Sequence, residues 1–380
     1  MFFQELIRTT TPFIWTITGI FTLSLIIQLF YYLVTYGRIL RHKLPQPEPG
    51  DIPVSVIICA RNEAENLAQN LPSVLEQDYP DYEVIVVNDC STDHSEDVLM
   101  EMKSRYPHLR YTSIPPDRKF THGKKLAVTV GIKGARNEHL LFTDADCYPV
   151  SASWIRHMIT PFHEQIRLVL GVGKYKKRRG LLNILVRYET IITAMQYLGA
   201  ALGRRAYMGV GRNLAYTKSL FFDTNGFASH LKVRSGDDDL FVNEAAKRNN
   251  TAVQFHPESL TISEPPARFN TWIKQKRRHF TTGKYYRAGS RWRLGTELLS
   301  RIFFYGTLIV LLWVDPWWYV AVAAGLTQSI LKMIVLKAVM VRLNEKDLLL
   351  PSFLLEPLMP LILGAIRIMN IKRRGEPKWS

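Results

Sequence analysis

Three features are scarce in this sequence: cysteine, internal repetition and acidic charge. Only three cysteines occur among 380 residues, and Cys59, Cys90 and Cys147 show neither a metal-ligand spacing nor an obvious pairing scheme. A small disulfide-stapled module is therefore excluded, and reduced, buried thiols are expected. Because no repeat is visible, the length predicts one substantial domain with additional elements instead of a repeat array.

The shortage of acidic residues leaves a large positive charge. Lys and Arg number 49 against 33 Asp and Glu, a formal net charge of +16 at pH 7. Such an excess points to an anionic partner: nucleic acid, anionic lipid or a phosphorylated substrate. Much of the basic excess flanks apolar segments and no nucleic-acid motif is present, so we expect membrane lipids and no nucleic acid as partners.

Residues 13–34 contain no charged side chain over the roughly 20 residues that cross a bilayer core. Trp15, Tyr31 and Tyr32 lie near the ends of this segment, as interfacial anchors do. A transmembrane helix is predicted. A secretory signal is the alternative, but the apolar stretch is long for one and lacks a small-residue cleavage site.

Basic residues are distributed unequally around this segment. Arg38, Arg41 and Lys43 follow it, whereas Arg8 before it is offset by Glu5. The positive-inside rule therefore places the residues that follow in the cytoplasm.

The carboxyl-terminal part is also apolar. Two spans are predicted at residues 298–314 and 317–336, with tryptophans at their junction. The last apolar segment, residues 348–366, contains three prolines and Glu356 and precedes a basic tail. It predicts a re-entrant or interfacial element with a cytoplasmic tail instead of a third carboxyl-terminal span.

Between these regions the pattern is that of an α/β protein. After a proline-rich linker, apolar runs alternate with helix-like segments: strands at 54–60, 82–89, 109–114 and 139–144, helices at 62–77, 91–105 and 124–135. Such alternation predicts a mostly parallel sheet with helices on both faces, which binds ligands beyond the carboxyl ends of its strands.

The alternation fades after residue 150. We predict a strand at 167–173 and helices at 181–202 and 238–248. The helix at 181–202 is apolar but includes Arg187 and Glu189, which favours a buried or interfacial helix over a span. The expected domains are 1–45 for the first transmembrane helix and linker, 46–290 for the cytoplasmic α/β domain with interfacial helices, and 291–380 for the transmembrane or re-entrant region.

Three groups of carboxylates stand at strand ends or loop starts: Asp89; Asp144 and Asp146; Asp237, Asp238 and Asp239. Each alone has a structural explanation as turn, cap or helix-dipole chemistry. Together they favour one site. An Asp-x-Asp pair at a strand end offers hard oxygen ligands for one Mg²⁺ or Mn²⁺ that also takes diphosphate oxygens, and a further carboxylate can act as general base.

Six motifs occur in the order found in the family-2 inverting glycosyltransferases, membrane-anchored enzymes with a GT-A fold. They are VSVIICARNEAENL, VIVVNDCSTD, GKKLAVTVGI, FTDADC, SGDDDLFV and QKRRH. The sequence over about residues 53–283 resembles this family, which implies an α/β GT-A domain and a nucleotide-sugar donor.

The resemblance also implies roles for individual residues. Glu63 and Asp89 match the contacts to the nucleotide base and ribose, and Lys124 matches a basic residue near the nucleotide. Asp144 and Asp146 match the DxD motif, with Asp146 as its metal ligand. Asp237 and Asp238 match the acidic pair, which makes Asp238 the expected base. Asp239 is adjacent and is the alternative candidate for this role.

The motif QKRRH resembles the family's QxxRW signature, with Gln275 and Arg278 matching and His279 in place of Trp. The departure weakens the prediction of an aromatic platform for an acceptor sugar. A basic amphipathic helix on lipid headgroups is the structural alternative. Gly209 and Gly211 resemble a segment that flanks the acceptor, although packing explains them nearly as well.

The expected activity is therefore metal-dependent, inverting transfer of a sugar, expected from a UDP-sugar, to a lipid, lipid-linked or glycan hydroxyl. A processive polysaccharide synthase and a non-catalytic nucleotide-sugar-binding membrane scaffold are the alternatives. The sequence identifies neither the sugar, the acceptor, nor the oligomeric state.

Overall fold

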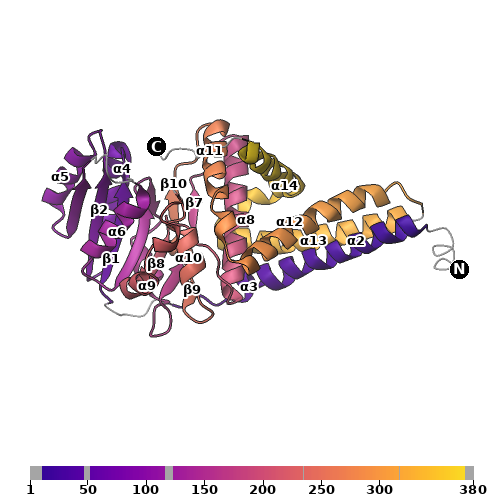
Figure 1. Cartoon of the computed structure of the whole chain (residues 1–380), viewed down its shortest axis with the longest axis horizontal. Coiled ribbons are helices and arrows are strands. Elements are labelled where there is room, and N and C mark those ends of the chain that lie inside the picture. The colour runs from indigo at the N-terminus through magenta and orange to yellow at the C-terminus, as the bar shows by residue number, and fades with distance from the viewer. Residues whose placement is uncertain (1–10, 47–51, 116–122, 234, 316, 373–380) are drawn as a thin grey trace.

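The computed structural model describes residues 11–46, 52–115, 123–233, 235–315 and 317–372 (Figure 1). In this part of the chain the larger sheet contains β1 (Val54–Ala60), β2 (Tyr82–Asp89), β3 (Leu109–Ile114), β4 (His139–Asp144), β6 (Leu168–Leu170), β8 (Leu214–Thr217) and β9 (Thr251–Val253). A smaller sheet contains β5 (Cys147–Pro149), β7 (Gly173–Tyr175) and β10 (Thr261–Ser263). The strand orders are β3-β2-β1-β4-β8-β6-β9 and β5-β10-β7.

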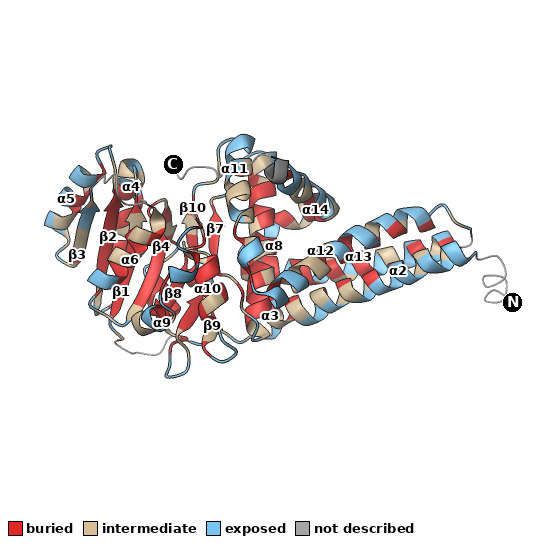
Figure 2. Ribbon diagram, in the orientation of Figure 1, coloured by how far each residue is buried: buried red, intermediate tan, exposed pale blue. Residues whose placement is uncertain are grey.

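The larger sheet is mostly parallel, as predicted. β1 pairs in parallel with β2 and β4, and β2 pairs in parallel with β3. β8 runs antiparallel to both β4 and β6. The first four strands begin and end at the predicted residues. β1, β2 and β4 are continuous apolar runs that are largely buried, whereas β3 is mostly half-buried or exposed (Figure 2).

Helices cover the two faces of this sheet. α6 (Lys124–Gly134) packs on one face with Ile57, while Val56 and Ile58 point to the opposite face. A Cβ at Gly131 of α6 would stand 2.7 Å from Ile57 Cγ2, so glycine permits the close approach of helix to strand. The opposite face is covered by α4 (Ala64–Leu75), α5 (Ser95–Arg105) and α7 (Trp154–Ile159).

Beyond residue 150 the chain differs from the prediction in one detail. The single strand expected at 167–173 is two strands, because the chain leaves the larger sheet after Leu170 and joins the smaller sheet at Gly173. The predicted helices are present as α8 (Leu181–Leu202) and α10 (Asp239–Ala245). A short helix, α9 (Lys218–Asp223), and the basic helix α11 (Phe269–Phe280) complete this region.

Four helical segments are long and apolar enough to cross a membrane: Pro12–Arg41, Ala288–Leu311, Trp317–Arg342 and Lys346–Met369. The first consists of α2 (Pro12–Leu29), the π-helical η1 (Phe30–Tyr36) and α3 (Gly37–Arg41). The others correspond to α12 (Ala288–Leu311), α13 (Trp317–Arg342) and α14 (Leu349–Lys372). α2, α12 and α13 pack side by side and extend away from the sheets, with α8 across the base of this bundle (Figure 1).

Two predictions about the apolar segments have different outcomes. α8 is largely buried inside the protein and is not among the candidate spans, in agreement with the prediction. The re-entrant break expected at 348–366 is wrong, because α14 is one continuous helix through Pro357 and Pro360. Neighbouring helices can compensate for the hydrogen bonds that prolines remove. An interfacial position of α14 stays a prediction.

The predicted orientation in the membrane rests partly on residues outside the described ranges. Glu5 and Arg8 lie there, as do Arg373 and Arg374 of the predicted basic tail. The cytoplasmic orientation therefore stays a prediction.

Candidate active site

Many of the residues singled out from the sequence converge at the carboxyl ends of β1 and β4. Asp144 ends β4 and lies beside Cys59 of β1, because the two strands pair in parallel. A small cavity opens at this point. Its lining includes Cys59, Lys124, Thr143, Asp144, Gly211, Asp237 and Asp238.

Lys124, the first residue of α6, joins two of the aspartate groups. Its Nζ lies 2.7 Å from Asp144 Oδ1 and 3.2 Å from Asp237 Oδ2. Burial would raise the pKa of Asp144, but the Lys124 ammonium outweighs that effect and lowers it. Burial would likewise lower the pKa of Lys124, yet Asp144 and Asp237 raise it well above its ordinary value. Lys124 is therefore a fixed positive charge in the cavity.

Asp146 lies close to Asp144 but outside the strand. β4 ends at Asp144, and Asp146 belongs to the turn that leads into β5. Ligand atoms of Asp144, Asp146 and Cys147 all lie within 4.8 Å of one another. Burial raises the pKa of Asp146, and the Asp144 carboxylate raises it further. A cation between the two carboxylates would relieve this repulsion.

The chemistry of this group fits a hard divalent cation. Burial raises the pKa of the Cys147 thiol well above its ordinary value, so it remains protonated. Carboxylate oxygens then remain as ligands, and these suit Mg²⁺ or Mn²⁺. Asp144 and Asp146 are the residues that could hold such an ion.

Asp238 is held rigidly at the edge of the cavity. Its Oδ2 accepts a hydrogen bond of 2.8 Å from the Gly211 N–H, and its Oδ1 accepts one of 2.7 Å from the Asp239 N–H. Burial raises the pKa of Asp238 to about 7, and the charges of Asp237 and Asp239 contribute. Its carboxylate can therefore exchange a proton near neutral pH.

Asp239 has a different environment from its neighbour. Its Oδ2 accepts hydrogen bonds from the hydroxyls of Thr282 and Tyr286, the latter at 2.6 Å. It is buried and does not line the cavity. Asp239 therefore anchors the chain that follows α11, and the geometry distinguishes two residues that are adjacent in sequence.

The loops after β1 and β2 are hydrogen-bonded to each other. Ser91 Oγ accepts from the Asn62 N–H, and Asp93 Oδ2 accepts from the Ala64 N–H, at 2.9 and 3.0 Å. Turn and capping chemistry therefore accounts for Ser91 and Asp93. Asp89 is different, because it is completely buried and its Oδ2 has no hydrogen-bond partner among the described residues.

Glu63 precedes the first residue of α4 and lies on the same side of the sheet as the aspartates. Asn66 donates a hydrogen bond of 2.5 Å to Glu63 Oε2. Burial raises the pKa of Glu63, and the charges of Asp146 and Asp144 contribute. Glu63 is thus electrostatically part of the aspartate cluster.

α11 brings the QKRRH motif to the same region. The Gln275 amide donates to the Tyr175 hydroxyl at 2.9 Å, while Gln275 Oε1 is buried with no partner in the described chain. Arg278 is close enough to lower the pKa of Asp144. His279 is exposed to solvent. The structure therefore places Arg278 within electrostatic reach of Asp144, and Gln275 beside Tyr175.

Sequence reasoning missed Arg212. Its guanidinium lies over the Tyr175 ring at 4.5 Å and contributes to lowering the pKa of Asp144. A Cβ at Gly173 would overlap the Arg212 side chain, so glycine makes room for it. The only signal was a basic residue beside Gly211 in a glycine-rich segment.

The two glycines of that segment have different roles. A Cβ at Gly209 would stand 3.0 to 3.2 Å from Leu214 and two other apolar side chains, so packing explains this glycine. Gly211 instead presents its N–H to Asp238. A Cβ at Gly211 would stand 3.4 Å from Asp238 and Lys124, an ordinary contact distance, so its role here is the hydrogen bond from its N–H.

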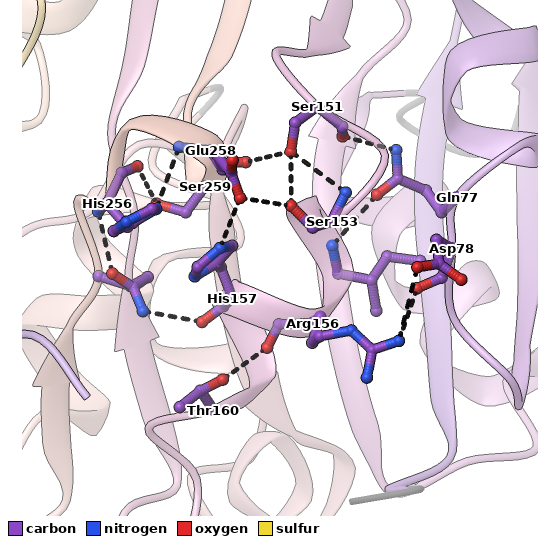
Figure 3. A network of polar contacts seen from close by, with 12 residues as sticks. Gln77, Asp78, Ser151, Ser153, Arg156, His157, Thr160, His256, Glu258 and Ser259 are labelled. Atoms are coloured by element: carbon purple, nitrogen blue, oxygen red, sulfur yellow. Dashed lines mark hydrogen bonds and ion pairs between the residues drawn. The ribbon is translucent and has the colours of Figure 1, made fainter. Parts of the chain in front are cut away.

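A second group of possible metal ligands lies elsewhere, at α7 and the loop before β10 (Figure 3). Glu258 Oε2 lies 3.0 Å from His157 Nε2 and accepts a 2.8 Å hydrogen bond from Ser153. The His157 and His256 rings are stacked with centroids 4.2 Å apart. Since His157 Nε2, Glu258 Oε2 and His256 Nδ1 already pair with protein groups, the network joins α7 to the loop, and we assign it a structural role.

Comparisons with known proteins identify the family and the fold. A family model described as "Glycosyltransferase like family 2" matches residues 49–282. The chain is 24% identical over 238 residues to the probable glycosyltransferase YdaM of Bacillus subtilis (strain 168), covering 61% of this chain and 55% of that protein. It is 28% identical over 143 residues to a poly-beta-1,6-N-acetyl-D-glucosamine synthase of Staphylococcus epidermidis, covering 37% of this chain and 33% of the synthase. The matched segments thus span well under two thirds of these relatives.

A solved structure shares the fold over a longer range. The mannosyltransferase PcManGT from Pyrobaculum calidifontis, in complex with GDP-Man and Mn²⁺, superposes with a TM-score of 0.56 at 18% identity. The superposition covers 89% of this chain and 97% of that chain. At this level of identity the likeness shows a common fold.

Proposed function

The chain belongs to the glycosyltransferases like family 2, and from this premise we propose that it is a metal-dependent, inverting enzyme that uses a nucleotide-diphospho-sugar. The fold is that of the GT-A enzymes. The acceptor in this proposal is the hydroxyl of a lipid, a lipid-linked molecule or a glycan. The observation that carries the proposal is a cavity in which Asp144, Asp238 and Lys124 meet.

In the proposed reaction Asp238 is the general base. Its position is fixed by two backbone N–H groups, and its pKa of about 7 suits proton removal at neutral pH. The acceptor hydroxyl loses its proton to Asp238 as its oxygen bonds to the anomeric carbon. The bond from that carbon to the diphosphate breaks at the same time, and the nucleotide leaves with the electron pair. A single displacement inverts the anomeric configuration without a covalent sugar intermediate.

Positive side chains would stabilise the departing diphosphate. Lys124 already pairs with Asp144 and Asp237, and the charges of Arg212 and Arg278 also act on Asp144. When bound at Asp144 and Asp146, a divalent cation supplies Lewis-acid neutralisation of the diphosphate. Asp144 and Asp146 lie close enough together to hold this ion.

Two buried polar atoms support a nucleotide and acceptor site around this cavity. Asp89 Oδ2 and Gln275 Oε1 lack hydrogen-bond partners within the described residues. Buried polar groups are normally paired. We propose that Asp89 and Glu63 contact the nucleoside, and that Gln275, Arg278 and His279 border the diphosphate and the acceptor.

The membrane location is part of the same proposal. Four helices can cross a bilayer by length and composition. We propose a multi-pass cell-membrane protein in which residues 46–290 form the catalytic domain on the cytoplasmic side. The nucleotide-sugar donor would then be reached from the cytoplasm, and the acceptor from the bilayer.

A processive polysaccharide synthase is the second candidate function. One relative is named a poly-beta-1,6-N-acetyl-D-glucosamine synthase, and Gln275 and Arg278 of the QxxRW-like motif are both present. A non-catalytic scaffold is less well supported, because all three carboxylate groups are present.

The test is release of nucleotide from a panel of UDP- and GDP-sugars by the full chain in liposomes, with Mn²⁺, Mg²⁺ or chelator, and with or without lipid extract. One donor should be consumed in a metal-dependent manner. Product length distinguishes single addition from processive synthesis. Equal activity of wild type and Asp146→Asn would contradict the metal assignment.

A further inference from the structure

A second cavity lies away from the aspartate site, where the first membrane helix meets the sheet domain. It is formed by η1 and α3, the carboxyl-terminal end of α8 and the first turns of α12, and its volume is about 260 Å³. This is close to the lower end of the about 300–1,000 Å³ typical of small-molecule sites. The lining residues used below are Phe30, Tyr31, Arg38, Arg205, Arg293 and Glu297. The cavity is large enough for a headgroup and too small for a whole lipid.

The charges of this cavity are not balanced. Glu297 is already neutralised, because it pairs with Arg301 and accepts hydrogen bonds from Tyr36 and Gln196. In contrast, the arginines Arg38, Arg205 and Arg293 form no ion pair with any carboxylate in the described part of the chain. Three guanidinium groups around one cavity therefore lack an anion.

Arg293 is held in place before any ligand binds, and Arg38 has space made for it. Arg293 Nη2 donates to the backbone carbonyl of Arg205 at 3.0 Å, and Arg293 Nε donates to Gly289 O at 3.3 Å. A Cβ at Gly203 would collide with the guanidinium of Arg38, so this glycine provides the space in which Arg38 lies. Such pre-organisation lowers the entropic cost of binding an anion.

The other side of the cavity is apolar and faces the bilayer region. Phe30 is 53% exposed and continues a row of exposed apolar side chains along α2. The Tyr31 hydroxyl donates to the Arg293 carbonyl at 2.7 Å, so its ring forms a fixed wall. Trp292, which is 78% exposed, lies next to Arg293 at the start of a candidate span. Tryptophan at such a position is typical of the membrane interface.

We propose that this cavity binds the phosphate headgroup of a membrane lipid. The phosphate lies among Arg38, Arg205 and Arg293, and the first carbons of the lipid leave along Phe30 and Tyr31. The site is separate from the aspartate cavity, and the proposal holds whichever sugar the enzyme transfers. It adds a lipid-binding function at the junction of membrane helices and catalytic domain.

Binding of short-chain probes to the full chain in detergent, measured by native mass spectrometry, tests the proposal. The probes are dihexanoyl phosphatidate, dihexanoylglycerol and inorganic phosphate. Phosphatidate should bind one to one and at least about tenfold more tightly than either other probe, because only it offers both the charge and the chains. Equal binding of dihexanoylglycerol would overturn the proposal, and equal binding of inorganic phosphate would reassign the cavity to a soluble anion.

Matched variants separate this cavity from general surface charge. Arg38→Gln with Arg205→Gln should weaken phosphatidate binding about tenfold or more, whereas Arg204→Gln with Arg291→Gln removes two exposed charges outside the cavity and should change nothing. Gly203→Ala displaces the Arg38 guanidinium without removing charge and should also weaken binding. If the double variant with Arg38→Gln and Arg205→Gln does not fold, the Gly203→Ala variant provides the test. Equal losses in the test and control pairs would show charge attraction alone and overturn the proposal.

Discussion

The molecule contains two clusters of charged side chains that differ in how their charges are compensated. Among the membrane helices, Glu297 pairs with Arg301, and Glu356 lies 2.8 Å from Lys332 and 3.9 Å from Arg301. All four side chains are buried. In the sheet domain, five aspartates lie close together, at 144, 146, 237, 238 and 239, and within the described residues Lys124 is the side chain that forms ion pairs with them.

This difference in charge compensation gives the two clusters different roles, one in stability and the other in binding and catalysis. Two acids and two bases cancel in the helix bundle, so this cluster needs no ligand and joins α12, α13 and α14. Each buried charge there requires its partner, because an isolated ion in an apolar medium is costly. The aspartate cluster retains excess negative charge and a carboxyl group of raised pKa, which are features of a site that awaits a cation and a substrate.

Loss of the proposed base should have the largest effect. Asp238→Asn is expected to lower kcat by about 10²- to 10⁴-fold, while donor binding persists, because the amide oxygen of asparagine can still accept one of the two backbone hydrogen bonds. Turnover and donor binding would be measured separately.

Asp239→Asn is the matched control, since Asp239 anchors Thr282 and Tyr286 instead of lining the cavity. It should reduce thermal stability more than turnover. Equal kinetic losses in both variants would contradict the assignment of the base.

Breaking the compensated cluster should affect stability instead of chemistry. Glu356→Gln leaves Lys332 buried without its 2.8 Å partner, and a loss of about 3–5 kcal/mol in the free energy of unfolding is expected. Unfolding in detergent micelles measures this. Adding Lys332→Met to Glu356→Gln should restore most of the stability. If the second substitution does not restore the free energy of unfolding, loss of charge compensation is not the cause of the destabilisation.

The pH dependence of turnover should report the aspartate cluster. Because the pKa of Asp238 is raised to about 7, kcat/KM should fall about tenfold per pH unit below that value and level off above it. Lys124→Met should move this limb to higher pH, since the Lys124 ammonium lowers the pKa of Asp238. If the fall of kcat/KM at acidic pH does not shift in the Lys124→Met variant, a group other than Asp238 titrates.

The smallest expected effect concerns Arg212. Gly173→Ala places a methyl group in the space of the Arg212 side chain, and overpacking of this kind costs about 1–3 kcal/mol. We expect a several-fold higher KM for the donor with a smaller change in kcat. Restoring glycine at position 173 provides the control. An unchanged KM for the donor in Gly173→Ala would show that Arg212 does not contribute to the donor site.

Local sequence patterns determined the framework of this protein. The limits of the first four strands and the positions of α2, α12 and α13 were predicted, because apolar runs specify strands and largely apolar segments of bilayer length specify candidate spans. These signals depend on neighbouring residues alone.

Tertiary structure decided what depends on contacts between distant residues. Asp238 and Asp239 are adjacent, yet one meets Gly211 and the other meets Tyr286, 47 positions away. Arg212 lies over Tyr175 in space that Gly173 leaves free, and α14 packs against α8, α11, α12 and α13. Side chains acquire their roles from the groups that surround them after folding, and a linear pattern does not contain those groups.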